Sequence, residues 1–326
     1  MNAVDHNNVV IFDDRGIPSI MCRFVRPKDT EEVPAVFKIG DKVADAIYIS
    51  KYPNIVIDGR AYSMPMADPT VNITFDEAVQ ACRCKGLGWH LMTAVEYEYL
   101  LNQSREKGTM PHGNTDWGKD YYHNEEQGKV SNLGRTYTGT GPVTWNHDHT
   151  PYGVSDLNGN VWEWLAGLRI KDGVIEFIPG NKAASPYCDL SKDSTEWQQA
   201  ETSKGPVRAN VECGEITITD AVAADDYEPN YDGVRIEELE VKLSEIPQVL
   251  KDLGIIPDKR AEEEGKTYVY FDATEGEYLP IRGSAFNDTS NSGPSALGLS
   301  YPRSYSGVSI GFRSAFYEVN GKLITE

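Results

Sequence analysis

The sequence is poor in basic residues. Lys and Arg together number 31 against 50 Asp and Glu, so the formal net charge of the 326-residue chain is −19 at pH 7. A surface that binds nucleic acid or an anionic membrane needs clustered Lys and Arg, and the sequence has no such cluster. We therefore expect no nucleic-acid partner.

Long apolar runs are also missing. No stretch approaches the roughly 20 apolar residues that cross a bilayer as a helix. The N-terminal run MNAVDHNNVVIFDDRG lacks the basic start and the apolar centre of a secretory signal. We expect neither membrane insertion nor a signal peptide. Apolar residues nevertheless make up 40% of the chain, which is enough to bury a sizeable core.

Cysteines and familiar catalytic motifs are scarce. The sequence has no G-x-S-x-G nucleophile motif, and its six His residues form no readable metal triad. The five cysteines are odd in number and scattered, which favours reduced thiols over a disulfide framework or a zinc site. They are Cys22, Cys82, Cys84, Cys188 and Cys213.

The local signals that are present indicate a few short helices and many hairpin-linked strands. Two capping boxes, each a Thr followed three residues later by Glu, predict helices over residues 75–85 and 94–107. A strand is expected over 160–170, followed by a Lys-Asp-Gly hairpin turn at 171–173. Elements of this kind are typical of an α+β domain.

The chain is expected to contain a small part and a large part. Residues 1–45 are predicted to form a small β-rich N-terminal module or arm, and residues 46–326 are predicted to form the main domain. Within the main domain, we expect an acidic insertion at about 180–270, with a helix over 235–253 and a strand over 268–271.

The final segment has an unusual composition. Residues 283–316 contain no Lys, Glu, Gln, Met or Trp, although the rest of the chain uses all five. The segment is rich in Ser, Gly, Asn and Tyr, with apolar residues spaced along it as anchors. Tyr offers rigid contact area, and Ser, Gly and Asn offer adaptable hydrogen bonding, as in antibody paratopes. The composition favours a binding loop, and a solvated Ser/Gly-rich loop without function is the alternative.

Three motifs point to a known family. They are GWHLMT at 88–93 with Glu96, DLNGNVWEW at 156–164, and RGS at 282–284 with IGFR at 310–313. In this order they resemble the variable proteins of diversity-generating retroelements. These proteins have a C-type lectin fold of the formylglycine-generating-enzyme (sulfatase-modifying factor) type. The resemblance covers roughly residues 46–326 and implies that α+β fold here.

The resemblance implies that the final segment is a variable region, at about 283–316. In such systems, error-prone reverse transcription replaces the adenines of asparagine-type codons. Codons with a pyrimidine at the third base cannot become Lys, Glu, Gln, Met or Trp, and all five are missing from the segment. The variable, ligand-binding positions implied by the resemblance are Ala285, Phe286, Asp288, Thr289, Gly298, Ser300, Tyr301, Tyr305, Gly307, Val308 and Ser309.

The related enzymes have two metal sites, and this sequence departs from one of them. The related enzymes bind copper through two cysteines, whose places fall here on Asn287 and Ser292, so we expect formylglycine-generating activity to be absent. A structural calcium ion at the tryptophan motif is the one cofactor implied, and a turn closed by ordinary hydrogen bonds is the alternative. Its ligands would be the side chains of Asp156 and Glu163 and the carbonyls of Gly159 and Val161.

We expect a binding protein without enzymatic activity. Its variable region would recognise a protein or a cell-surface receptor, and it could form a homo-oligomer. The absence of a signal peptide favours a phage or prophage receptor-binding protein, present in the virion tail or in the cytoplasm before assembly. Two alternatives stay open: a formylglycine-generating-type oxidoreductase with relocated cysteines, Cys188 or Cys213, and a calcium-dependent glycan-binding lectin, although we expect no direct sugar coordination.

Overall fold

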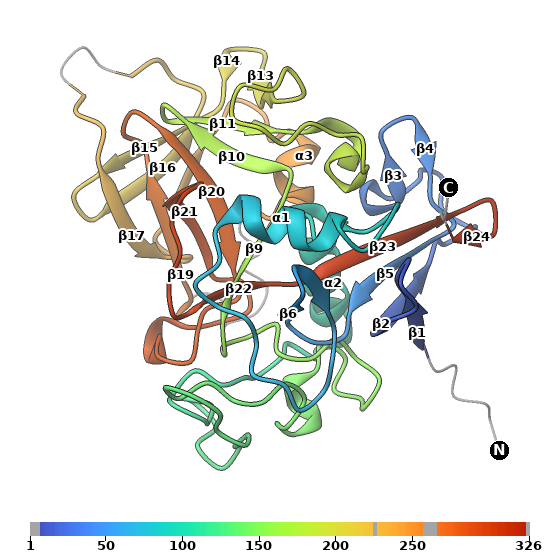
Figure 1. The fold of residues 1–326 in the computed structure, drawn as a ribbon. Helices are drawn as coiled ribbons and strands as arrows, with labels where there is room; N and C mark the ends of the chain where they lie inside the picture. Colours follow the sequence, from blue (N-terminus) through green and yellow to red (C-terminus); the bar gives the residue numbers. More distant parts are fainter. Residues whose placement is uncertain (1–6, 224–226, 257–265, 324–326) are drawn as a thin grey trace.

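The structure is a computed structural model that describes residues 7–223, 227–256 and 266–323. Its strands form two main sheets, a smaller one built from both ends of the chain and a larger one built from its middle and C-terminal parts (Figure 1). None of the helices in the described part of the chain has the length and apolar character needed to cross a membrane.

The smaller sheet joins the beginning of the chain to its end. Its order is β1-β2-β5-β23-β24, and β8 also pairs with β23. Strands β1 and β2 continue the ladder of β5, so residues 8–25 belong to the smaller sheet with β1 at its edge. Residues 1–6 of the expected N-terminal module lie outside the described residues. The strands are β1 (Asn8–Phe12), β2 (Pro18–Val25), β5 (Ala46–Ser50), β8 (His90–Leu91), β23 (Ser314–Val319) and β24 (Lys322–Leu323).

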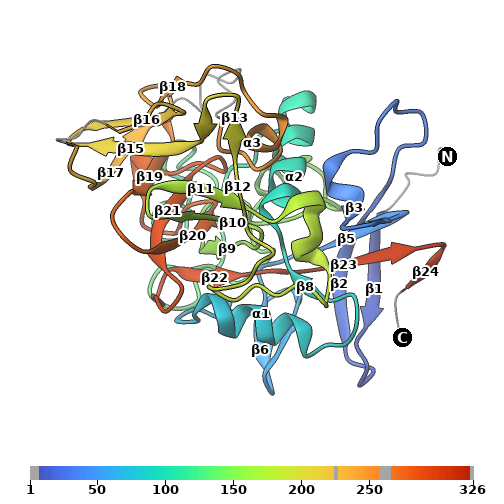
Figure 2. The ribbon, with the colours of Figure 1, turned by 90° about the horizontal axis from the view of Figure 1, so that it is seen from above.

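The larger sheet has twelve strands among the described residues. Its order is β17-β19-β21-β20-β10-β11-β15-β16-β18, with β12 on β11, β9 on β20 and β22 on β9 (Figure 2). The acidic insertion expected at about 180–270 supplies several of these strands, so it is built into the same sheet as the final segment. The strands are β9 (Trp162–Trp164), β10 (Leu168–Lys171), β11 (Val174–Phe177), β12 (Gln198–Gln199), β15 (Arg208–Glu212), β16 (Glu215–Thr219), β17 (Tyr231–Arg235), β18 (Glu240–Lys242), β19 (Tyr268–Asp272), β20 (Glu277–Arg282), β21 (Leu297–Pro302) and β22 (Ile310–Phe312).

Short elements complete the described part of the chain. Three two-stranded ribbons are β3 (Lys38–Ile39) with β4 (Lys42–Val43), β6 (Ile55–Ile57) with β7 (Arg60–Tyr62), and β13 (Glu201–Thr202) with β14 (Gly205–Pro206). The 3₁₀ turns are η1 (Ala35–Phe37), η2 (Val143–Trp145), η3 (Pro179–Ala184) and η5 (Thr289–Asn291).

Both helices with capping boxes form where the sequence predicts them. Helix α1 (Phe75–Arg83) has Thr74 as its N-cap, and α2 (Ala94–Lys107) has Thr93, each with both reciprocal hydrogen bonds of the box. Helix α2 ends at Gly108, which adopts the left-handed conformation that favours glycine at this position. The apolar side of α2 packs into the main hydrophobic cluster.

The helix predicted over 235–253 is wrong. Its first part is the end of β17 and the strand β18, which pair with β19 and β16. Only α3 (Gln248–Asp252) is helical, and it begins directly after Pro247. A proline inside a helix removes a hydrogen bond and clashes with the preceding turn, so Pro247 is compatible only with a helix start. Pairing with the neighbouring strands therefore determines the structure of the first part of this segment.

The strand predicted over 160–170 is two strands. Strand β9 ends at Trp164 and β10 begins at Leu168, with Gly167 at a φ of +88° between them. The hairpin turn that follows is confirmed, because β10 and β11 pair across Asp172 and Gly173, both at positive φ. Such a turn matches the twist of the two strands it connects.

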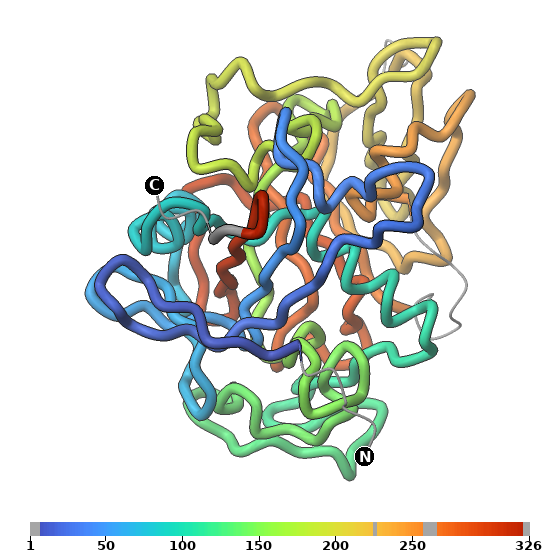
Figure 3. Tube along the Cα trace, turned by 90° about the vertical axis from the view of Figure 1, so that its right-hand side faces the viewer, coloured from blue at the N-terminus to red at the C-terminus, as the bar shows by residue number. Residues whose placement is uncertain are grey.

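The final segment passes from one sheet to the other. Strand β22 lies parallel to β9 in the larger sheet, and β23 lies antiparallel to β5 in the smaller one. Arg313 is the one residue between them. The loops of residues 109–150 form a base with little regular structure, seen in green at the bottom of Figures 1 and 3.

Candidate functional site

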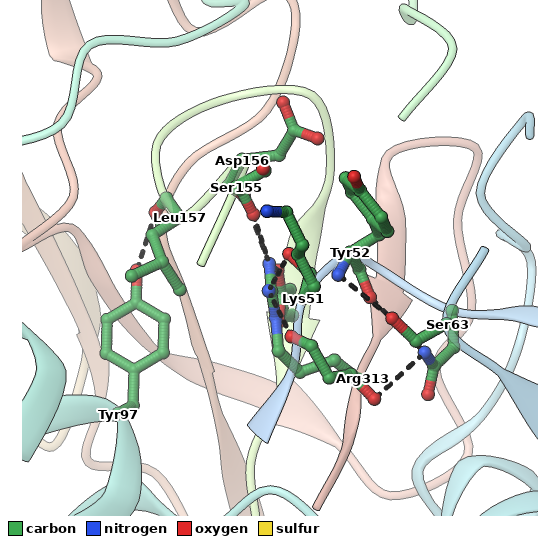
Figure 4. A network of polar contacts seen from close by, with 12 residues as sticks. Lys51, Tyr52, Ser63, Tyr97, Ser155, Asp156, Leu157 and Arg313 are labelled. Atoms are coloured by element: carbon green, nitrogen blue, oxygen red, sulfur yellow. Dashed lines mark hydrogen bonds and ion pairs between the residues drawn. The ribbon is translucent and has the colours of Figure 1, made fainter. Parts of the chain in front are cut away.

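Arg313 fixes the C-terminal end of the final segment. Its guanidinium is fully buried and bonds both carboxylate oxygens of Glu163, at 2.7 and 2.5 Å. It also donates to the carbonyls of Ser50 and Ser155, each at 3.0 Å (Figure 4). One side chain therefore joins the smaller sheet, strand β9 and the turn at the tryptophan motif.

Arg282 fixes the other end of the segment. It is buried, pairs with Glu98 on α2 at 2.9 Å and donates to the carbonyl of Ser295. The next residue, Gly283, has a φ of +92°, and a Cβ there would lie 2.6 Å from the Leu157 carbonyl oxygen and 2.8 Å from the Tyr97 hydroxyl. Only glycine fits this approach. The ends of the final segment are therefore held by buried ion pairs and close backbone packing.

Strand β21 shows how the interior of the segment is anchored. Leu297 and Leu299 are buried, and Ala296 before them is also buried. Ser300 and Tyr301, which follow, are half-buried. The apolar residues hold the backbone in the core while the polar and aromatic side chains near them reach towards solvent.

The implied variable positions divide into three groups. Tyr305 and Val308 are exposed, at 39% and 48% of their surface. Six are half-buried, namely Asp288, Thr289, Ser300, Tyr301, Gly307 and Ser309. Ala285, Phe286 and Gly298 are buried.

Two of the buried positions correct the sequence expectation. Ala285 is fully buried, and Phe286 packs edge-on against Trp117 with ring centroids 5.0 Å apart. Their side chains are therefore unavailable to a ligand in this structure. Sequence alone could not exclude them, because their burial depends on the loop that contains Trp117, more than 150 residues earlier.

Four implied positions meet in one pocket. Asp288, Gly298, Ser300 and Tyr301 line a cavity of about 200 Å³. The rest of its lining is Trp162, Tyr231, Tyr270 and Ile281. Sequence reasoning missed these framework residues. The signal that could have indicated them is the run of tyrosines in the acidic insertion, at Tyr231 and Tyr268–Tyr270.

The pocket contains one partly buried carboxyl group. Burial raises the pKa of Asp288 to about 6, although hydrogen bonds from the Ala285 N–H and the Trp162 side chain lower it in part. Burial also raises the pKa of Tyr270 and of Tyr301 to about 12. At neutral pH the pocket therefore has neutral phenols and an ionised carboxylate.

Aromatic residues continue from the pocket to the surface. The rings of Tyr301 and Tyr305 stack with centroids 4.2 Å apart and planes 18° apart. On the other side of the segment, the Tyr122 hydroxyl donates to the Ser290 carbonyl, and Trp117 is more than half exposed. The loop of residues 109–150 therefore borders the variable region.

The residues of the implied calcium site do not fit calcium. Both carboxylate oxygens of Glu163 bond Arg313, so a divalent cation would lie beside a guanidinium. The Gly159 carbonyl accepts a hydrogen bond from the Val161 N–H. Burial raises the pKa of Asp156 to about 6, and its carboxylate accepts from the Gly139 N–H. Among the described residues, no group of three or more His, Cys, Asp or Glu could hold a metal ion.

We therefore expect a chelator to have no effect on stability. Dialysis against EDTA should leave the Tm unchanged, because the Arg313–Glu163 pair already neutralises the carboxylate that calcium would need. Differential scanning calorimetry with and without added calcium is the measurement. A fall in Tm that calcium restores would show that an ion replaces this pair.

The residues present do not fit the copper site of the related enzymes either. Asn287 is exposed, and the Ser292 hydroxyl donates to the Thr289 carbonyl at 2.6 Å. Neither side chain supplies the thiolate that copper(I) prefers. Cys188 is buried, which raises the pKa of its thiol to about 11, whereas Cys213 is exposed in the turn between β15 and β16.

A tripeptide relevant to the lectin alternative is present. Sugar-binding C-type lectins use Glu-Pro-Asn or Gln-Pro-Asp, and the chain contains Glu228-Pro229-Asn230 directly before β17. The sequence motif alone therefore does not exclude direct sugar coordination. All three residues are exposed, and they belong to no metal-binding group of acidic, His or Cys side chains in the described ranges.

Residues 51–207, just under half of the chain, match the family model described as a sulfatase-modifying factor enzyme 1-like domain. The chain contains a sulfatase-modifying factor enzyme 1-like domain. The match includes the tryptophan motif, and few helices with many strands in mixed sheets confirm the expected α+β fold of the formylglycine-generating-enzyme type. The chain is 36% identical over 105 residues to the formylglycine-generating enzyme of Mus musculus, a match that spans 30% of this chain and 27% of that enzyme.

Solved structures similar to this chain include PvdO, a variable protein and a variant of the Major Tropism Determinant. PvdO from Pseudomonas aeruginosa is 14% identical with a TM-score of 0.39, over 95% of this chain and 98% of that one. Treponema denticola variable protein 1 is 11% identical with a TM-score of 0.38, over 95% and 99%. The U1 variant of the Major Tropism Determinant is 13% identical with a TM-score of 0.32, over 84% of this chain and 50% of that one.

Proposed function

We propose that this chain is a non-catalytic binding protein whose surface at residues 283–316 is diversified by a retroelement. The observation that supports the proposal most is a contrast within one segment. Its ends are held by the buried pairs of Arg282 with Glu98 and of Arg313 with Glu163. Between them, eight of the eleven implied variable positions are exposed or half-buried. A fixed scaffold with replaceable side chains is what repeated diversification requires.

The chemistry of the surface supports contact without reaction. Tyrosines and small polar residues make up most of its exposed positions, as they do in antibody paratopes. Adenine replacement in asparagine-type codons cannot produce Lys, Glu, Gln, Met or Trp, and all five residue types are absent from 283–316. A partner that is a protein or a cell-surface receptor suits such a surface, and a phage or prophage tail protein is the proposed setting, in the virion or in the cytoplasm before assembly.

The enzymatic alternative rests on the similarity to formylglycine-generating enzyme. That similarity covers 30% of this chain and 27% of the enzyme. Against it stand Asn287 and Ser292 in place of the implied copper cysteines, and the different exposure of Cys188, which is buried, and Cys213, which is exposed. Copper binding with oxygen-dependent turnover of a cysteine-containing peptide would favour the enzyme over the binding protein.

Sequencing the DNA that flanks the gene tests the proposal. We expect a reverse-transcriptase gene and an imperfect repeat of the codons for residues 283–316. In this repeat, asparagine codons should stand at the variable positions, because adenines are the bases replaced. Flanking DNA on both sides with neither a reverse transcriptase nor such a repeat would contradict diversification by a neighbouring retroelement.

A further inference from the structure

The pocket within the variable region has walls of aromatic rings. Trp162 and Tyr270 stand with ring centroids 6.4 Å apart and planes 75° apart, so they form two faces of a corner. Tyr231 and Tyr301 complete the aromatic lining. Tyr301 is supported from outside by its stack with Tyr305. Its volume, about 200 Å³, is several times the roughly 30 Å³ that one water occupies in the liquid, so it can hold a side-chain-sized group.

The charge of the pocket is negative. Asp288 is its one acidic lining residue, and no Lys, Arg or His lines it among the described residues. Two further negative charges act on Tyr231, because Asp232 and Asp272 both raise its pKa. A positive charge lies beyond Tyr270, where Arg235 sits over the ring of Tyr268, which stacks on Tyr270. Asp288 itself raises the pKa of Tyr270 and of Tyr301. A cation entering the pocket would therefore be attracted by the carboxylate and by the ring faces together.

We propose that this pocket binds an organic cation, an alkylammonium or similar positively charged group of the ligand. Aromatic rings attract cations over their faces, and the attraction is stronger where water is excluded. The partly buried carboxylate of Asp288 supplies the charge partner that a desolvated cation needs. An anionic group would meet Asp288 with no cation to offset it. The inference rests on the proposed binding function and names the chemical class that this variant of the surface accepts.

The pocket combines fixed and replaceable parts. Trp162, Tyr231 and Tyr270 lie outside the variable segment, so the aromatic corner would persist among descendants. Asp288 and Gly298 lie within it. Replacement of Asp288 by a neutral residue would remove the charge. A Cβ at Gly298 would lie 2.9 Å from Ile281 Cγ1 at the pocket wall, so a larger residue there would narrow the cavity. The preference for a cation is therefore a property of this variant, because it depends on residues within the variable segment. The aromatic walls formed by residues outside the segment are part of the scaffold.

Calorimetric titration of the full chain with choline and with 3,3-dimethylbutan-1-ol tests the proposal. The two molecules have nearly the same shape, and only choline is charged. We expect choline to bind at least tenfold more tightly than the alcohol at pH 7.5. Asp288→Asn should remove this preference, and Tyr301→Leu should weaken choline binding at least tenfold. Tyr187→Ala, which changes an exposed tyrosine outside the segment, should leave it unchanged.

The same titration at pH 5 provides a second criterion. The pKa of Asp288 is about 6, so about a tenth of the carboxylate is ionised there and choline should bind about tenfold more weakly. The tyrosines around it stay neutral over this range. No saturable choline binding, equal binding of the alcohol, or choline binding unchanged in Asp288→Asn would each overturn the inference. The proposed function would survive that failure if substitutions in descendants still fall on the variable codons, and would fail separately if they do not.

Discussion

Arg313→Met is expected to lower the free energy of unfolding by about 3–5 kcal/mol, because it leaves the Glu163 carboxylate buried without its partner. Methionine is similar in length and supplies no hydrogen-bond donor. The carbonyls of Ser50 and Ser155 would lose a donor as well. This is the largest single effect that we expect in the chain, since the guanidinium joins two sheets and the turn at the tryptophan motif.

Urea denaturation followed by circular dichroism measures this effect. Arg15→Met is the matched control, because Arg15 pairs with Asp58 at an exposed site and should change stability by less than about 1 kcal/mol. The double variant Arg313→Met with Glu163→Met should recover much of the loss, since no unpaired charge remains. A loss below about 1 kcal/mol for Arg313→Met alone would show that this residue does not fix the end of the segment.

Two neighbouring residues of β21 should respond very differently to substitution. Leu299→Ala is expected to cost about 2–5 kcal/mol, because the side chain is fully buried and its removal leaves a cavity. Ser300→Ala should change stability by no more than about 0.5 kcal/mol, since Ser300 is half-buried at the pocket and its loss disturbs no packing. The difference follows because the side chain of Leu299 is packed in the core, whereas that of the next residue, Ser300, lines the pocket.

Thermal unfolding of the two variants, with wild type measured alongside, checks this contrast. The order of the Tm values should be wild type and Ser300→Ala together, with Leu299→Ala clearly lower. If the Tm of both variants were lowered by similar amounts, Ser300 would be part of the framework. The variable surface would then be smaller than proposed.

The features that the sequence predicts well are local. The capping boxes at Thr74 and Thr93 and the turn at Asp172 and Gly173 depend on residues within a few positions of each other. The hydrogen bonds and backbone conformations that form them involve only neighbouring residues. The structure therefore has these elements where the sequence pattern predicts them.

The features that the sequence does not predict depend on distant pairing. Tyr231 and Tyr270 reach the pocket because β17 pairs with β19 and β19 with β21. Residues in that register are far apart in the chain, and no short-range pattern specifies it. The resemblance implies that Phe286 is a ligand-binding position, but its ring is buried and packs against Trp117. The helix expected over 235–253 fails for the same reason, because β18 pairs with β16 instead.

The most direct test of the central claim is to sequence this gene in many clonal descendants of one cell or phage that has an active retroelement beside it. The account predicts that substitutions concentrate in the codons for residues 283–316 and at adenines of the template repeat, while the codons for Arg282 and Arg313 stay unchanged. Substitutions spread evenly along the gene, or found equally at all four bases, would contradict it.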